Sequence, residues 1–99
     1  MNHQITEIQI IPIKPQNGII AFVSFLLDNS LYLSSIALMT RPGGGHRLVY
    51  PTKKVGNRDI NVFHPINKVF AQFIEEAVMK KFEEVMNLND RYDRADLTT

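Results

Sequence analysis

The spacing of the apolar residues changes near residue 69, and this change limits the folds that the chain can adopt. From Val69 onward apolar side chains recur every three or four residues, which is typical of one face of an α-helix. The apolar stripe consists of Phe70, Phe73, Ile74, Ala77, Val78, Phe82, Val85 and Met86. Asn67 is its expected N-cap. A stripe of this length must pack against another apolar surface, which the first two thirds of the chain have to supply.

That first part is rich in β-branched residues and turn signals, so it predicts strands. The expected strands are residues 5–13, 19–27, 31–39, 46–50 and 60–63, with loops at residues 40–45 and 53–57. Asn17-Gly18 predicts a tight hairpin turn, because both residues tolerate positive φ. Pro12 lacks an amide donor and belongs on a sheet edge or at a bulge. Near Val23 the alternation breaks, which indicates a bulge or burial on both faces.

These elements predict the α+β class, with an antiparallel β-sheet followed by a C-terminal amphipathic helix packed on it. Residues 1–86 are expected to form a single domain, and residues 87–99 a polar, flexible tail. So small a domain is marginally stable alone and gains from pairing. Cysteine is absent, which excludes disulfides and thiolate zinc sites. With neither an export signal nor a membrane span in the sequence, we expect a cytoplasmic protein.

The overall balance of charge conceals a local excess of positive charge. The net charge is +1, yet residues 1–60 carry a net +3 and residues 61–99 a net −2. Five cations and no Asp or Glu fall between residues 41 and 58: Arg41, Arg47, Lys53, Lys54 and Arg58. A chain polarised in this way can present a basic surface to an acidic partner. The alternative is an ordinary solvated loop.

The basic stretch most strongly suggests binding to DNA or RNA. Arg41, Arg47, Lys53, Lys54 and Arg58 are the residues expected to contact phosphates, and Tyr50 offers a ring for stacking on a base. The backbone amides of Gly43-Gly44-Gly45 could also meet a phosphate, although a flexible turn is the simpler interpretation. No alternating aromatic platform is visible in the sequence, so we expect weak base specificity.

Enzymatic and metal-binding patterns are weak. The three histidines lie outside any catalytic motif, and His64 before Pro65 is typical of a rigid junction, with a site of His64 and Asp59 as the weaker alternative. The pairs Glu75-Glu76 and Glu83-Glu84 fall on the solvated face of the predicted helix rather than in a metal site. We therefore expect no enzyme, no metal, no cofactor and no small-molecule substrate.

Several short motifs occur in an order that resembles the SpoVG family of septation and sporulation regulators. They are Ala21, Ser24 and Asp28, then Val49-Tyr50-Pro51-Thr52-Lys53-Lys54, Arg58-Asp59-Ile60, His64-Pro65-Ile66-Asn67 and Ala77-Val78. The similarity extends roughly from residue 5 to residue 86. It implies a small α+β domain, a homodimer, and site-selective binding of DNA and RNA that regulates gene expression in bacteria.

The resemblance also assigns roles to residues. Lys53, Lys54 and Arg58 stand where family members carry basic residues that contact nucleic acid. The loop Val55-Gly56-Asn57 is shorter than the usual family loop, and the sequence of residues 41–45 is unusual, as is the acidic tail. These departures bear on affinity and target preference rather than on the fold. The alternative function is a protein-interaction adaptor that docks an acidic partner without binding nucleic acid.

Overall fold

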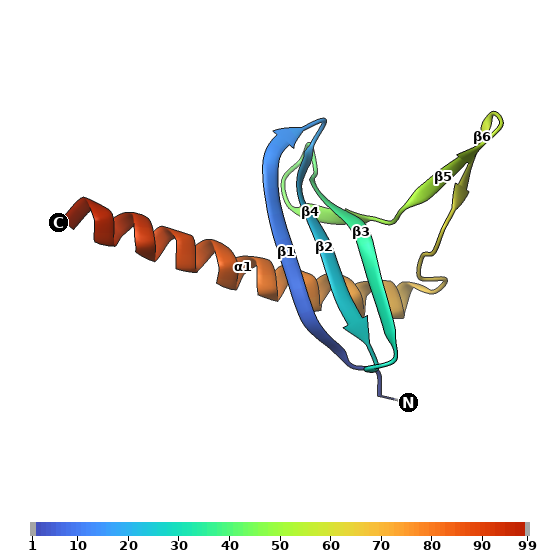
Figure 1. Cartoon of the computed structure of the whole chain (residues 1–99), viewed down its shortest axis with the longest axis horizontal. Helices are drawn as coiled ribbons and strands as arrows, with labels where there is room; N and C mark the ends of the chain where they lie inside the picture. The colour runs from blue at the N-terminus through green and yellow to red at the C-terminus, as the bar shows by residue number, and fades with distance from the viewer. Residues whose placement is uncertain (1, 99) are drawn as a thin grey trace.

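The computed structural model describes residues 2–98, with side chains up to residue 87, and contains two antiparallel sheets and one helix (Figure 1). The larger sheet has the order β1 (Ile5–Gln16), β2 (Ile19–Leu27), β3 (Leu31–Thr40) and β4 (His46–Val49). The smaller sheet pairs β5 (Thr52–Val55) with β6 (Arg58–Asn61), and α1 spans Lys68–Thr98. The predicted α+β class is confirmed.

Three local predictions about the sheet are also confirmed. Asn17 and Gly18 adopt φ values of 54° and 85° in the turn between β1 and β2, as a tight hairpin requires. Pro12 lies on the edge strand β1, next to a shift in register. The register of β2 against β3 shifts between Val23 and Phe25, which is the expected bulge.

The hydrophobic core lies between the larger sheet and α1, which crosses one face of that sheet (Figure 1). The sheet contributes Ala21, Val23, Phe25, Ile36, Leu38 and Leu48, and the helix contributes Ile74 and Val78. A helix of 31 residues is roughly 46 Å long, whereas four strands about 4.8 Å apart span only about 15 Å. The sheet therefore covers only part of the helix, and Met86 of the apolar stripe stays exposed.

The segment after β4 differs from the prediction. The prediction of a loop at residues 53–57 is wrong for residues 53–55, because residues 52–55 form β5. The next strand covers residues 58–61 rather than 60–63. Gly56 has a φ of 62° at the first central position of a two-residue turn, which fits a type II′ hairpin. The flexible tail at residues 87–99 stays a prediction, since the side chains after residue 87 lie outside the described part.

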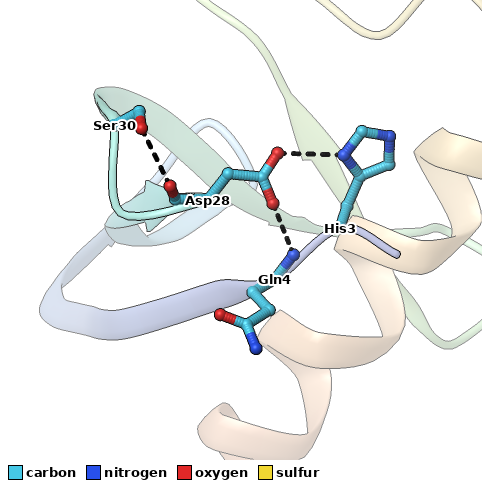
Figure 2. A network of polar contacts seen from close by, with 4 residues as sticks. All are labelled: His3, Gln4, Asp28 and Ser30. Atoms are coloured by element: carbon cyan, nitrogen blue, oxygen red, sulfur yellow. Dashed lines mark hydrogen bonds and ion pairs between the residues drawn. The ribbon is translucent and has the colours of Figure 1, made fainter. Parts of the chain in front are cut away.

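A network of polar contacts ties the N-terminal segment to the turn between β2 and β3 (Figure 2). The Asp28 carboxylate accepts a hydrogen bond from the Gln4 amide at 2.7 Å and contacts His3 Nδ1 at 2.9 Å. The Ser30 hydroxyl donates to the Asp28 carbonyl at 2.9 Å. The His3 ring lies edge-on to Phe70 of α1, with 5.0 Å between the ring centroids. Asp28 thus fixes His3 against the start of the helix, and the hydrogen bond from His3 lowers the pKa of Asp28, followed by that from Gln4.

We predict that Asp28→Asn lowers the melting temperature at neutral pH. Asn tolerates the positive φ of residue 28, which is 53°, so the substitution removes the charge and keeps the turn. Because the pKa is lower in the folded chain than the ordinary value of 3.8, the stabilisation exists above that value and is lost as the pH falls through the lowered pKa. Thermal melting followed by circular dichroism should therefore show that the melting temperatures of Asp28→Asn and the unmodified chain converge in acid. A difference that persists in strong acid would contradict this origin.

Asn67 caps α1, as the sequence predicts. Its side-chain oxygen accepts a hydrogen bond from the Phe70 amide at 2.7 Å, and its carbonyl accepts one from the Ala71 amide at 3.1 Å. These contacts satisfy an amide that the first helical turn would otherwise leave without a partner. The cap fixes the residue at which the chain leaves the β5–β6 hairpin and enters the helix.

We predict that Asn67→Ala lowers the free energy of unfolding by about 1 kcal/mol, because it removes this cap. Asn67→Asp is the matched control, since a carboxylate accepts the same hydrogen bond and is favoured at a helix N-terminus. Urea denaturation followed by circular dichroism measures both. Equal losses in the two variants would show that the cap is not the cause.

Candidate nucleic-acid interface

The β5–β6 hairpin, residues 52–61, projects from the body of the molecule (Figure 1). Every residue of its two strands is exposed. A hydrogen bond from the Val62 amide to the Pro51 carbonyl, 2.9 Å long, closes its base. The hairpin carries Lys53, Lys54 and Arg58, which we call the hairpin cations. Three of the predicted phosphate-contacting residues therefore lie on one narrow ribbon.

The register of the hairpin divides these cations between its two faces. Lys53 pairs with Ile60, and Val55 pairs with Arg58. Paired residues share a face and neighbours along a strand alternate, so Lys53 and Arg58 lie on the same face as the two apolar residues. Lys54 lies on the other face, opposite Asp59. The face with Lys53 and Arg58 thus carries a net positive charge, whereas on the other face the charge of Asp59 offsets that of Lys54.

Arg41 and Arg47 lie at a different place, around the connection between β3 and β4. They line an open hollow of about 730 Å³ together with the Asn17-Gly18 turn. Two hydrogen bonds of 3.0 Å, from the Arg41 amide to the Gly45 carbonyl and from the Gly44 amide to the Arg41 carbonyl, close the glycine loop. Figure 1 shows this loop well apart from the tip of the β5–β6 hairpin. Within one chain the five cations therefore form two groups rather than one.

Neither group is neutralised by an ion pair among the residues whose side chains the structure describes. The ion pairs found there join His3 to Asp28 and Lys81 to Glu84. The cations of both groups are exposed, so their charge is available to a ligand. Such side chains bind phosphates with little preference for sequence.

Tyr50 lies deeper than its proposed stacking role requires. Its ring packs against the core and meets Phe63 edge-on, with 6.1 Å between the centroids. Its hydroxyl is buried and has no hydrogen-bond partner. Burial, with a smaller contribution from Glu75, raises the pKa of Tyr50 to about 12. Base stacking by Tyr50 stays a prediction. The sequence signal for its core contact was its spacing from Leu48, because residues two apart on a strand share a face and Leu48 is buried.

The sequence of the chain was also compared with those of known protein families. The sequence model of the SpoVG family matches residues 3–84 of the chain. The chain belongs to the SpoVG family. The match includes all six strands, the hairpin cations and the first half of α1, so the resemblance inferred from short motifs is confirmed over nearly the same span.

Two relatives in this family are both named "Putative septation protein SpoVG". The protein from Caldicellulosiruptor saccharolyticus is 25% identical over 88 residues, which cover 88% of this chain and 99% of the relative. The protein from Treponema denticola is 24% identical over 82 residues, covering 82% of this chain and 87% of the relative. The similarity to both relatives thus spans most of the SpoVG domain.

His64 lies in the connection between β6 and α1. His64 Nδ1 lies 3.0 Å from the Pro65 carbonyl, a local contact that fits the expected rigid junction before the helix. Among residues 2–87, whose side chains the structure describes, no group of three or more potential metal ligands is found. No helix in this described range is long and apolar enough to cross a membrane.

We predict that Tyr50→Phe removes part of the alkaline sensitivity of the SpoVG domain. The pKa of Tyr50 is raised from 10.0 to about 12 in the folded chain, so its contribution to stability is present below pH 10 and is lost as the pH rises toward 12. Melting temperatures measured across this range should fall less steeply for Tyr50→Phe than for the unmodified chain. Tyr32→Phe is the control, because Tyr32 is exposed. Identical slopes for all three chains would contradict the burial of this hydroxyl.

Proposed function

We propose that this SpoVG-family chain is a cytoplasmic regulatory protein, not an enzyme, that binds DNA or RNA as a homodimer and thereby affects gene expression, septation or sporulation. The observation that carries the proposal is the β5–β6 hairpin. It is exposed, it projects from the body, and it bears three cations on two faces. The names of the two relatives support a role in septation.

The shape of the hairpin suits a nucleic-acid ligand. A two-stranded ribbon can enter the major groove of DNA. Because Lys53 and Arg58 lie on one face and Lys54 on the other, a ribbon between two phosphate backbones can contact both of them. These contacts would position the protein without reading the sequence.

In a homodimer, two copies of the hairpin can bind the same nucleic acid, so that the weak contacts of each copy add together. Pairing also has a physical motive on the surface of the chain, since Ile66 and Val69 near the start of α1 are strongly exposed. Burial of such side chains contributes roughly 25 cal/mol per Å² of apolar surface. We therefore include a second copy of the chain in the proposal.

We predict that simultaneous replacement of Lys53, Lys54 and Arg58 by Ala weakens binding to all nucleic-acid sequences. If a dimer makes about six phosphate contacts, the affinity of the unmodified protein should fall on the order of a thousandfold between about 50 and about 200 mM salt. The triple variant should bind more weakly and show a shallower salt dependence, because fewer counterions are released. Fluorescence anisotropy with random DNA and RNA pools measures both quantities.

The matched control replaces Lys14, Lys68 and Lys80, three exposed cations outside the hairpin. This control loses the same charge, so it should retain most of the salt dependence if the hairpin is the contact surface. Equal effects of both triple variants would indicate only a general electrostatic attraction. A wild-type protein that retains no complex at moderate salt would favour the alternative, an adaptor for an acidic protein partner.

A further inference from the structure

The outer face of the larger sheet, on the side away from α1, is uncovered (Figure 1). Three large side chains are exposed on it: Ile11 by 60%, Phe22 by 40% and Tyr32 by 62%. Ile11 and Phe22 are cross-strand partners on β1 and β2. Tyr32 lies on β3, so the three residues come from three adjacent strands.

These side chains border a small hollow of about 130 Å³ that also has polar groups. Gln9 and Ser24 are cross-strand partners next to the pair of Ile11 and Phe22. Ser34 reaches the hollow from the bulged part of β3. Ligand sites usually combine an apolar lining with a few polar groups in a volume of about 300 Å³ or more, so this smaller hollow can hold only one ring of a ligand.

Ser24 is the most informative residue of this hollow. It is only 8% exposed, and it is the buried polar residue of the described part of the chain. It lines the hollow, so its hydroxyl can donate or accept a hydrogen bond to a ligand there.

We propose that this hollow binds an unpaired base of single-stranded nucleic acid, stacked on Phe22 or Tyr32 and hydrogen-bonded by Ser24. The inference rests on the proposed function, because the hairpin cations would hold the phosphates of the same strand. Every base has an apolar face and a polar edge, which matches aromatic rings beside hydroxyl and amide groups. Aromatic residues on a four-stranded sheet stack bases in one common class of RNA-binding module.

The chemistry of the hollow also argues against its use for duplex DNA. No cation lines it, so it offers a phosphate no opposite charge. A paired base is stacked and its hydrogen-bonding edge is occupied, so it cannot enter. The hollow therefore adds affinity for unpaired strands alone, whereas the hairpin cations contribute to both.

The test compares a single-stranded oligonucleotide with a duplex of the same sequence at fixed salt. Tyr32→Ala and Phe22→Ala should each weaken single-strand binding about tenfold, since stacking on one ring is worth roughly 1–3 kcal/mol per base. Duplex binding should not change. Tyr32→Phe should keep the affinity because it keeps the ring, and Leu31→Ala, which removes an adjacent exposed apolar side chain, is the matched control.

A second measurement does not depend on the folding of a variant. Single strands containing 5-iodouracil, irradiated in complex with the unmodified protein, should form cross-links that mass spectrometry assigns to Phe22 or Tyr32. Cross-links confined to other residues would overturn the proposal. Unchanged single-strand affinity of Phe22→Ala and Tyr32→Ala would also overturn it. If these variants changed the mass measured by sedimentation and not the affinity, this face would instead be a contact between copies of the chain. Binding to neither form of nucleic acid would instead refute the proposed function itself.

Discussion

The packing of Ile74 and Val78 of α1 against the inner face of the larger sheet is the contact on which the rest of the structure depends. With one helix, the chain can cover only one face of one sheet. Every other surface follows from that limit. The outer face stays open, the end of the helix extends past β1, and the β5–β6 hairpin has no layer behind it (Figure 1). Function is therefore to be sought on the parts that the core does not use.

The sequence predicts the elements well where local chemistry decides the structure. The Asn17-Gly18 turn, Pro12 on an edge and Asn67 as a cap each follow from the geometry of one or two residues. The β5 strand was missed because a short, polar segment after Pro51 has no apolar alternation. Its signal was the Gly56-Asn57 dipeptide, which closes a two-residue hairpin.

Tertiary contacts were harder to predict, and the candidate site depends on them. Alternation along β2 separates Phe22 from Ala21 and Val23, but a period of two shows only which residues share a face. It does not show that a face lacks a cover. The juxtaposition of Phe22 and Tyr32 depends on the register of β2 against β3, which includes a bulge. The burial of Tyr50 likewise depends on Phe63, a residue from another part of the chain.

The two surfaces differ in the physics of their binding, and this difference decides what each can contribute. Contacts between the hairpin cations and phosphates release counterions, so they are strong in dilute salt, weak in concentrated salt and independent of sequence. Stacking on Phe22 or Tyr32 buries apolar surface and releases no counterions, so it persists as salt increases. Stacking should therefore raise the ratio of single-strand to duplex affinity by the same factor at every salt concentration, and Phe22→Ala or Tyr32→Ala should remove that factor. Phosphate contacts alone already make this ratio rise with salt, because duplex affinity falls by about 0.9 and single-strand affinity by about 0.7 logarithmic units per contact and tenfold increase in salt. The size of the ratio at a fixed salt concentration, and not its slope, therefore reports on stacking.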